Sequence, residues 1–359
     1  IILRRHTGAK IPNFESPSMT TREQVISGFL WTTNWKSARY TLLAGDASMR
    51  KYLRLGPGDD GRIAVLMDAD PALGNDVGPF VRITNYLRSI DLSAPEIFAT
   101  DPAQGLLIIE DLGDALFARV VAQDHTLEEP LYTAATDTLL HLHNAAPPTL
   151  TTYDATVMTD MAALAFDWYQ HGASDAVDIN AKTSFSDAFF SLLDTEISPP
   201  SVLIQRDYHA ENLLWLPERE GIARVGLLDY QDAQLGHPAY DLVSLLKDAR
   251  RDVPEAIEEK MIAHYIEASG TDAQDFRDAY HLLGLQRNLR ILGVFARLSM
   301  QFGKPSYIDL IPRVWDFIQR DLNHPVNAKV ANLITTALPA PTPEILQRLK
   351  DKCATVPTL

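Results

Sequence analysis

The chain has 359 residues, and 32 lysines and arginines stand against 47 aspartates and glutamates, so the formal net charge is −15. Hydrophobic residues make up 46%, which is enough for a sizeable core and excludes wholesale disorder. The negative charge argues against nucleic acid or an anionic membrane as a partner, and no apolar run approaches the roughly 18 residues of a membrane span. The single cysteine, Cys353, excludes a disulfide framework and suits a reducing cytosol. We therefore expect a cytoplasmic protein that handles a small molecule.

The N-terminal third of the chain carries strand patterns. Residues 1–18 have no clear periodicity, and because Met19 follows them we treat them as a leader, native or added. Thr20 and Glu23 have the spacing of a capping box and predict the start of a helix. Further along we predict strands over 38–44, 49–55 and 63–67, a helix over 77–90, and strands ending at Phe98 and over 106–109. This pattern predicts a small antiparallel N-terminal lobe over 19–112 that ends at a hinge.

The rest of the chain is mostly helical. Helical spacing is found over 127–144, 159–171, 182–195, 239–250, 254–267, 273–301 and 308–321. Two short strands, 202–204 and 225–228, interrupt this series. We expect a larger helical lobe over 113–327 and a Pro-rich tail over 328–359 that includes a short amphipathic segment. The predicted fold class is α+β, with two lobes.

The most informative stretch follows the first short strand of the helical lobe. Asp207 stands five residues before Asn212, and Asp229 ends the second short strand. Phosphoryl transfer needs a carboxylate that orients the attacking hydroxyl and oxygen ligands for Mg²⁺ at the nucleotide phosphates. Asp207 would be the catalytic carboxylate, and Asn212 and Asp229 would be the metal ligands. Each residue alone is more often a cap or a turn former, so the prediction depends on the joint pattern.

Longer motifs around these residues extend the pattern. They are Arg206-Asp207-Tyr208-His209-Ala210-Glu211-Asn212-Leu213-Leu214-Trp215, Leu227-Leu228-Asp229-Tyr230-Gln231-Asp232-Ala233, Gly236-His237-Pro238-Ala239-Tyr240-Asp241-Leu242 and Gly45-Asp46-Ala47-Ser48-Met49-Arg50-Lys51-Tyr52. With them the sequence resembles the aminoglycoside phosphotransferase/choline kinase branch of the protein-kinase-like fold, from about Thr20 to Asn327. It is similar above all to a bacterial subgroup, the anomeric kinases of cell-wall sugar recycling.

This resemblance implies a function. The cofactors would be ATP and Mg²⁺, and the substrates would be N-acetylmuramate and N-acetylglucosamine, phosphorylated on the anomeric hydroxyl. The product would pass to a sugar-1-phosphate nucleotidyltransferase. The resemblance also implies a bilobal protein-kinase-like fold, with a small antiparallel N-lobe that binds the nucleotide and a larger helical C-lobe.

One feature of that fold is missing from the sequence. Kinases of this type hold the α- and β-phosphates with a lysine on the third strand, and the predicted third strand, 63–67, has none. A cation of the second strand, Arg50, Lys51 or Arg54, would then replace it. The preceding turn would offer backbone N–H groups and the Ser48 hydroxyl, although an ordinary hairpin turn explains these residues equally well. The expected nucleotide contacts are Gly45, Asp46, Ser48, Arg50, Lys51 and, at the hinge, Glu110 and Leu112.

Other residues near these motifs are candidate substrate contacts: Tyr208, His209, Tyr230, Asp232, Arg287 and Arg290. His209 is better interpreted as a residue that positions the loop, and Asp241, at a helix start, as a residue that braces it. Arg287, Arg290 and Arg297 lie near one face of a long predicted helix, for which a solvated or ion-paired face is the default. A sharper hypothesis is that one of them contacts the lactyl carboxylate of N-acetylmuramate.

Two alternatives stay open. The chain could phosphorylate another small alcohol, such as an aminoglycoside or choline. It could also be a pseudokinase-like binding module, since the third-strand lysine is missing. A protein kinase is disfavoured because no Asp-Phe-Gly segment occurs. The sequence leaves the oligomeric state open.

Overall fold

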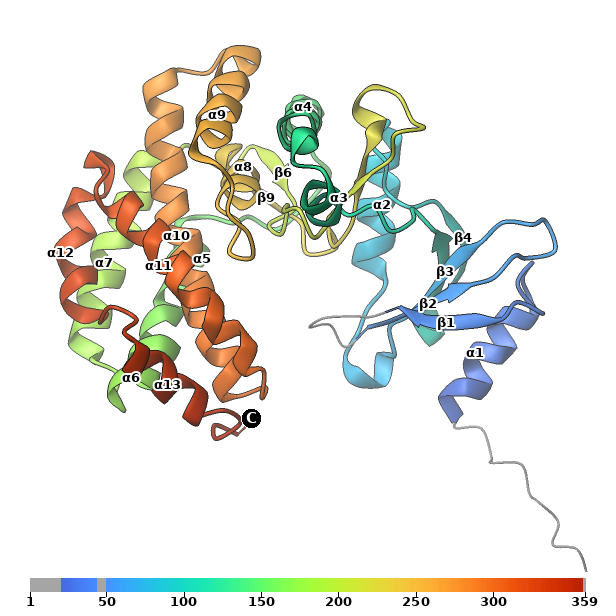
Figure 1. Ribbon diagram of the computed structural model, residues 1–359, viewed down its shortest axis with the longest axis horizontal. Helices are drawn as coiled ribbons and strands as arrows, with labels where there is room; N and C mark the ends of the chain where they lie inside the picture. The colour runs from blue at the N-terminus through green and yellow to red at the C-terminus, as the bar shows by residue number, and fades with distance from the viewer. Residues whose placement is uncertain (1–20, 44–49, 358–359) are drawn as a thin grey trace, which may run out of the picture. The chain divides into compact units, whose positions relative to one another are not determined.

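The computed structural model describes residues 21–43 and 50–357 (Figure 1). Its contacts divide the chain into two compact units. The sheet unit comprises Ile1–Gly78 and Glu96–Asp111, and the helical unit comprises Pro79–Pro95 and Leu112–Leu359. The predicted leader and the capping-box residue Thr20 lie outside the described residues.

The sheet unit is built on one antiparallel sheet of five strands. The order across the sheet is β1-β2-β3-β5-β4, with bounds Tyr40–Leu43 (β1), Lys51–Leu55 (β2), Ala64–Asp68 (β3), Ile97–Asp101 (β4) and Leu106–Glu110 (β5). β3 is buried along its whole length, because it lies between β2 and β5 and is apolar up to its last residue, Asp68. The predicted strands are confirmed, with ends that differ by a few residues.

Helix α1 (Thr21–Trp31) packs against this sheet. Its buried side chains are Ile26, Phe29 and Leu30, and they form one apolar cluster with residues of β2, β3 and β5. Arg22 pairs with the carboxylate of Asp68 at the end of β3 and also donates to the carbonyl of Gln104 at 2.8 Å. The burial of apolar area and this partly buried ion pair therefore fix the helix to the unit.

The helical unit contains the other α-helices of the described residues. They are α2 (Gly78–Ser89), α3 (Phe117–Gln123), α4 (Glu128–Asn144), α5 (Ala155–Leu164), α6 (His171–Ser174), α7 (Ile179–Glu196), α8 (Ala239–Leu246), α9 (Glu255–Ser269), α10 (Ala273–Met300), α11 (Ile311–Leu322), α12 (Ala328–Ala337) and α13 (Pro343–Asp351). Short 3₁₀ turns connect elements within each unit. In the sheet unit they are Pro71–Leu73 and Pro102–Gln104, and in the helical unit they are His125–Leu127, Gly221–Arg224, Pro305–Leu310 and Pro325–Asn327. Figure 1 shows α10, the longest of these helices, running through the helical unit beside α5 and α11. None of the helices in the described part of the chain combines the length and the apolar character that crossing a bilayer requires.

Helix α2 packs with the helical unit, although the chain enters and leaves it from strands of the sheet unit. The ring of Phe80 stacks on Tyr230 with 5.3 Å between ring centroids. The hydroxyl of Thr84 hydrogen-bonds to the hydroxyl of the same tyrosine at 2.7 Å. The helix predicted over 77–90 is confirmed, and its buried face belongs to the core that carries the predicted catalytic loop.

Two short two-stranded sheets frame that loop. β6 (Val202–Ile204) pairs with β9 (Gln234–Gly236), and β7 (Leu213–Trp215) pairs with β8 (Val225–Leu227). The predicted strands 202–204 and 225–228 are confirmed, while β7 and β9 were not predicted. β7 (Leu-Leu-Trp) and β9 (Gln-Leu-Gly) contain no β-branched residue, whereas Val202, Ile204 and Val225 favour a strand in the two predicted ranges.

One predicted helix is interrupted in the structure. The range 159–171 was expected to be a single helix, but α5 ends at Leu164 and a π-helical segment over Ala165–Gln170 follows before α6. α10 crosses at this point with Gly293, where an added Cβ would lie 2.3 Å from the carbonyl carbon of Leu164. The close backbone approach, which the helical spacing does not reveal, accompanies the change in hydrogen bonding.

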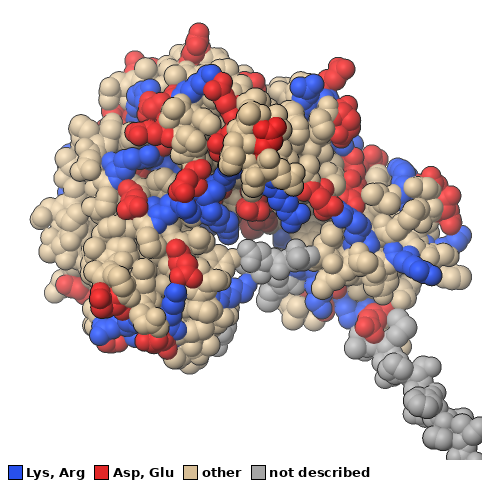
Figure 2. All heavy atoms as spheres, in the orientation of Figure 1, with Lys and Arg blue, Asp and Glu red and all other residues tan. Residues whose placement is uncertain are grey.

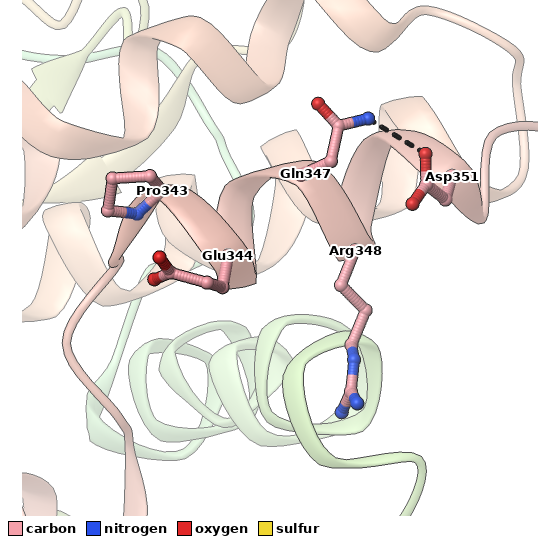
Figure 3. A pocket seen from close by; sticks show the side chains of 5 residues that line it. All are labelled: Pro343, Glu344, Gln347, Arg348 and Asp351. Atoms are coloured by element: carbon pink, nitrogen blue, oxygen red, sulfur yellow. Dashed lines mark hydrogen bonds between the residues drawn. The ribbon is translucent and has the colours of Figure 1, made fainter.

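The C-terminal range 328–359, expected to be a Pro-rich tail, contains α12 and α13. The hydroxyl of Tyr169 donates to the carbonyl of Pro339 at 2.7 Å, and the amide of Gln170 donates to the carbonyl of Ala337 at 2.9 Å. Figure 3 shows a shallow hollow beside α13 that is lined by Pro343, Glu344, Gln347, Arg348 and Asp351. None of the predicted site residues borders this hollow, so we do not treat it as the substrate site.

Candidate active site

The loop between β6 and β7 carries the predicted catalytic residue, Asp207. It begins with Gln205 and Arg206, whose backbone N–H groups donate to the two carboxylate oxygens of Asp241 at 2.6 and 2.9 Å. Arg206 has a φ of 73°, in the left-handed region that costs free energy for a residue other than glycine. The carboxylate of Asp241, at the start of α8, therefore holds the loop in a conformation that its own sequence does not favour. This is the bracing role that the sequence predicted for Asp241.

Burial raises the pKa of Asp241 to about 7, and the hydrogen bonds from Gln205 and Arg206 offset part of this effect. The side chain is fully buried. A carboxylate in such a place is satisfied by backbone donors and not by water.

The structure brings the three predicted residues Asp207, Asn212 and Asp229 together. The side-chain amide of Asn212 donates to the main-chain carbonyl of Asp207 at 2.9 Å and lies 3.5 Å from Oδ2 of Asp229. Oδ1 of Asp229 accepts a hydrogen bond of 2.7 Å from the amide of Gln231. Asp229 also has a positive φ of 57°, so its backbone departs from the strand that precedes it and turns its carboxylate to the loop.

Two arginines of α10 act on the carboxylate of Asp207. Burial alone would raise the pKa of Asp207, but the positive charges of Arg290 and then Arg287 more than offset burial, so the pKa lies below its ordinary value. The carboxylate is therefore ionised at neutral pH and able to accept a hydrogen bond from a hydroxyl. The default expectation of a solvated or ion-paired face does not hold for Arg287, which is only 4% exposed and has buried donors without a partner. α10 packs against α5 and α8, and helical spacing alone does not reveal these neighbours.

His209 lies in the same loop and is buried. Burial lowers the pKa of His209 to about 4, although the carboxylate of Asp248 acts in the opposite direction. The ring is therefore neutral at pH 7. Its Nε2 lies 3.4 Å from the side-chain nitrogen of Asn212, and the backbone N–H of Asn212 donates to the carbonyl of His209 at 2.8 Å. These contacts agree with a residue that positions the loop.

The donor set at Asn212 and Asp229 suits a hard cation. Because the side-chain nitrogen of Asn212 is engaged with Asp207, its amide oxygen points away from that bond and is available as a ligand. Asp229 adds an anionic oxygen, and carboxylate and amide oxygens are the ligands that Mg²⁺ takes in proteins. Among the described residues there is no group of three or more His, Cys, Asp or Glu side chains that could hold a metal ion. A metal at Asn212 and Asp229 would therefore take its other ligands from bound phosphate or water.

The sequence matches the profile of the Phosphotransferase enzyme family over residues 39–280. The chain belongs to this family. It is therefore an enzyme that phosphorylates an alcohol group, and the matched region includes the loop of Asp207 and the strand end at Asp229. The pseudokinase-like alternative is not favoured.

Curated relatives of this phosphotransferase share one name. The chain is 38% identical over 334 residues to the N-acetylmuramate/N-acetylglucosamine kinase of Caulobacter vibrioides, and the match covers 83% of this chain and 91% of that protein. It is 32% identical over 306 residues to the kinase of the same name from Pseudomonas putida, with 82% and 87% covered.

Solved structures of low sequence identity share its fold. A choline kinase from Streptococcus pneumoniae is 12% identical with a TM-score of 0.55, and the match covers 91% of this chain and 99% of that one. An ADP-bound aminoglycoside phosphotransferase is 14% identical with a TM-score of 0.55, and the match covers 86% and 98%. The predicted α+β, protein-kinase-like fold of the phosphotransferase is confirmed.

Two candidate substrate contacts of the phosphotransferase, Tyr208 and Tyr230, are core residues. Tyr208 is buried, and its hydroxyl donates to the carbonyl of Ala135 at 2.8 Å. Tyr230 is also buried and bonded to Thr84. Both tyrosines therefore belong to the core that holds the loop, while Asp232 is exposed beyond Asp229.

The predicted nucleotide residues are only partly described. Gly45, Asp46 and Ser48 lie outside the described residues. Lys51 is exposed at the start of β2, opposite Asp68 of β3. Arg54 pairs with Asp111, with 3.0 Å between Nη2 and Oδ1. Arg50 directly precedes β2. The carboxylate of Glu110 accepts a hydrogen bond from the backbone N–H of Glu96 at 3.1 Å. Leu112 packs against Leu214 and Leu216.

Sequence reasoning missed other residues that shape the site. Gln231 orients Asp229, and its spacing of two residues from that aspartate was the one available signal. Asp248 is buried near His209. The hydroxyl of Tyr153 accepts from Tyr240 of α8 at 3.3 Å and from Gln286 of α10 at 3.2 Å, and so connects the two helices. These contacts join distant parts of the chain, so no local pattern could have revealed them.

Proposed function

We propose that this phosphotransferase transfers the γ-phosphoryl group of ATP to the anomeric hydroxyl of N-acetylmuramate and N-acetylglucosamine, giving sugar 1-phosphates. The observation that carries the proposal is that Asp207, Asn212 and Asp229 meet at one loop in a chain 38% identical to a kinase named for these two sugars. The loop provides the groups that phosphoryl transfer requires, and the identity of the two sugars is inferred from the name of the relative.

Asp207 would be the catalytic residue. Its ionised carboxylate would accept a hydrogen bond from the sugar hydroxyl, orient the oxygen toward the phosphorus and take up the proton as the new bond forms. The carboxylate would remain ionised when the loop is otherwise dry, because Arg290 and Arg287 lower its pKa. His209, neutral and buried, would position the loop and would not compete as the base.

Asn212 and Asp229 would hold Mg²⁺ through one amide oxygen and one carboxylate. The bound cation would supply charge compensation for the phosphates. The protein fixes both ligands. The side-chain nitrogen of Asn212 donates to the main-chain carbonyl of Asp207 and to the carboxylate of Asp229, and the amide of Gln231 also donates to Asp229. Neither ligand needs to reorganise when the phosphoryl group is transferred.

Residues 19–112 would form the nucleotide lobe and 113–327 the catalytic lobe. We assign the phosphates of ATP to Gly45, Asp46, Ser48, Arg50 and Lys51, and the adenine to the backbone at Glu110 and Leu112. The candidates to replace the missing lysine stay Arg50, Lys51 and Arg54, of which Arg54 pairs with Asp111. The enzyme would act in the cytoplasm, in peptidoglycan recycling, where a nucleotidyltransferase would consume the sugar 1-phosphate.

Identification of the product tests the proposal. Purified protein is incubated with ATP, Mg²⁺ and each of N-acetylmuramate, N-acetylglucosamine, choline and an aminoglycoside, and ³¹P NMR with carbon coupling identifies the phosphorylated position. We expect phosphate on the anomeric carbon of both amino sugars. Turnover of choline or the aminoglycoside without turnover of either sugar, or phosphate on another sugar carbon, would show the proposal to be wrong.

A further inference from the structure

One face of α10 carries three arginines in a row: Arg287, Arg290 and Arg297. Spacings of three and seven residues place them on the same side of a helix. Arg287 is 4% exposed, and Arg290 and Arg297 are partly buried. Like charges on neighbouring turns repel one another, and the repulsion grows where water is excluded.

Several other basic residues of the helical unit are neutralised by a carboxylate. The pairs are Lys182 with Asp167, Arg251 with Glu128, Arg277 with Glu259, Arg313 with Asp252 and Arg320 with Glu258. Among the ion pairs within 4.0 Å in the described part of the chain, none includes Arg287, Arg290 or Arg297. The three arginines of this row therefore differ from the paired basic residues, because they are buried or partly buried and no carboxylate of the described residues lies within 4.0 Å of them.

Arg287 has donors without any acceptor in the protein. Its Nε and Nη1 are buried and make no hydrogen bond, and the same holds for Nε of Arg297. A buried guanidinium with unused donors is costly, and burial accordingly lowers the pKa of Arg287. Such a group is stabilised when an anion binds, since its planar fork of donors matches a carboxylate or a phosphate.

A chain of contacts connects these arginines to the catalytic loop. Gln286, the neighbour of Arg287, donates to the hydroxyl of Tyr153 at 3.2 Å, and that hydroxyl accepts from Tyr240 at 3.3 Å. Arg290 interacts with the same Tyr240. Tyr240 immediately precedes Asp241, which binds the first residues of the loop. The arginines thus lie beside Asp207 and not at a remote surface.

Charges of both signs surround the site. Arg206 adds a third guanidinium, which lies over the ring of Tyr153 at 5.3 Å. The facing carboxyl groups are Asp207, Asp248 and Asp241, and His209 is neutral. Figure 2 shows basic side chains gathered over the part of the helical unit where α8 and α10 lie in Figure 1. An acidic protein with a net charge of −15 therefore keeps guanidinium donors without an acceptor near Asp207.

We propose that Arg287 and Arg290 bind a carboxylate of the acceptor and that this group is the lactyl carboxylate of N-acetylmuramate. The inference rests on the proposed function, and it names the contact that distinguishes its two sugars. N-acetylmuramate is N-acetylglucosamine with a lactyl ether on C3, so the two substrates differ by one carboxylate. With the anomeric hydroxyl on C1 held at Asp207, the lactyl ether on C3 of the same ring would extend its carboxylate to the arginines.

The transferred phosphoryl group is the other anion that passes through the site. It is the same for both sugars, so an arginine that contacted it would serve both reactions equally. A contact to the lactyl group serves one. The ratio of kcat/KM for N-acetylmuramate to kcat/KM for N-acetylglucosamine therefore distinguishes the two roles.

The experiment measures this ratio for the wild type and for Arg287→Met, Arg290→Met and Arg290→Lys. Arg277→Met, which removes an ion-paired arginine from the exposed part of α10, is the matched control. The methyl ester of N-acetylmuramate serves as a substrate of the same shape without the charge. Thermal unfolding verifies that each variant is folded.

We expect the methionine variants to lower the ratio on the order of 10- to 100-fold, as the loss of a charge-assisted hydrogen bond does. We expect the wild type to prefer the free acid over the ester and the Arg290→Met variant to lose that preference. Arg290→Lys keeps the charge without the fork and should lower the ratio by less.

A ratio that stays within twofold of the wild type, or an equal loss on both sugars, would overturn the inference. If the methionine variants do not fold, the comparison of acid and ester with the wild type decides, and equal turnover of the two would overturn it. If the wild type phosphorylates neither sugar, the proposed function itself is wrong, and this outcome is distinct from an unchanged ratio.

Discussion

The side-chain amide of Asn212 donates to the main-chain carbonyl of Asp207 at 2.9 Å. One residue thus closes the loop with its nitrogen, and under the proposed function its oxygen would be a ligand of Mg²⁺. An aspartate at this position would keep the oxygen ligand and lose the donor. We expect Asn212→Asp to lower kcat at least about 100-fold, because the carbonyl of Asp207 loses its partner and the carboxylate is no longer held in place. The apparent affinity for Mg²⁺, from titrations of turnover against Mg²⁺, should not weaken. An unchanged kcat would contradict the loop-closing role.

Asp207 provides the most direct test of the reaction. Its replacement by alanine removes the group that orients and deprotonates the acceptor, and we expect kcat to fall by roughly 10²–10⁴-fold. Nucleotide binding, measured by calorimetry with ADP and Mg²⁺, should be retained. Glu211→Gln, an exposed carboxylate of the same loop, is the control and should stay within about twofold of the wild type. Near wild-type turnover by Asp207→Ala would refute the assignment.

Asp229 should act on the metal and not on the acceptor. Because Asp229→Ala removes the anionic ligand and leaves the amide oxygen of Asn212, we expect the Mg²⁺ concentration for half-maximal activity to rise at least about tenfold. Gln231→Leu removes the hydrogen bond that orients Asp229 and should cause a smaller shift in the same direction. Titration of activity against Mg²⁺ at saturating sugar measures both effects. An unchanged Mg²⁺ requirement in Asp229→Ala would place the metal elsewhere.

The proximity of Asp207, Asn212 and Asp229 could be predicted from the sequence because these residues are close along the chain. Asp207 and Asn212 share one loop, and Asp229 ends the next short strand, so spacing alone brings them near one another. The strands of the sheet unit were predicted for a similar reason, since their apolar runs are bounded by turn residues.

The surroundings of the centre depend on contacts between distant segments, and the sequence did not reveal them. Helical spacing placed Arg287 and Arg290 on one face, but whether Arg287 is buried depends on the elements that pack against α10. The π-helical segment after Leu164 lies where Gly293, more than a hundred residues away, approaches the backbone. A local pattern carries no information about which helix will cross it.

Arg290 should also affect the pH dependence of the reaction. Burial tends to raise the pKa of Asp207, and Arg290 is the largest influence that lowers it. In Arg290→Met burial is opposed less strongly, so the pKa of Asp207 should rise and the acid limb of kcat/KM should move to higher pH. The measurement uses N-acetylglucosamine, which has no carboxylate of its own, and Arg277→Met as the control. An acid limb at the same pH in the wild type and in Arg290→Met would contradict this electrostatic link.

Asp241 connects the stability of the protein to the conformation of its catalytic loop. Asp241→Ala would leave the backbone N–H groups of Gln205 and Arg206 buried without an acceptor. At about 1–3 kcal/mol for each unsatisfied group, we expect the free energy of unfolding of the helical unit to fall by roughly 2–5 kcal/mol. Denaturant unfolding followed by fluorescence measures this loss. A loss below about 0.5 kcal/mol would show that the loop does not depend on the carboxylate.

The pH dependence of the same residue has a definite sign. Burial raises the pKa of Asp241 to about 7 in the folded state, above its ordinary value of 3.8, so the folded protein binds a proton that the unfolded chain has released. This contribution to stability is fully present below about pH 4 and is lost as the pH rises through about 7, by at most about 1.4 kcal/mol per pH unit. Asp241→Asn cannot titrate at this position. The stability of the wild type relative to Asp241→Asn should therefore decrease between pH 4 and pH 7. A difference that stays constant over this range would show that the carboxylate is ionised throughout, held by the two N–H groups alone.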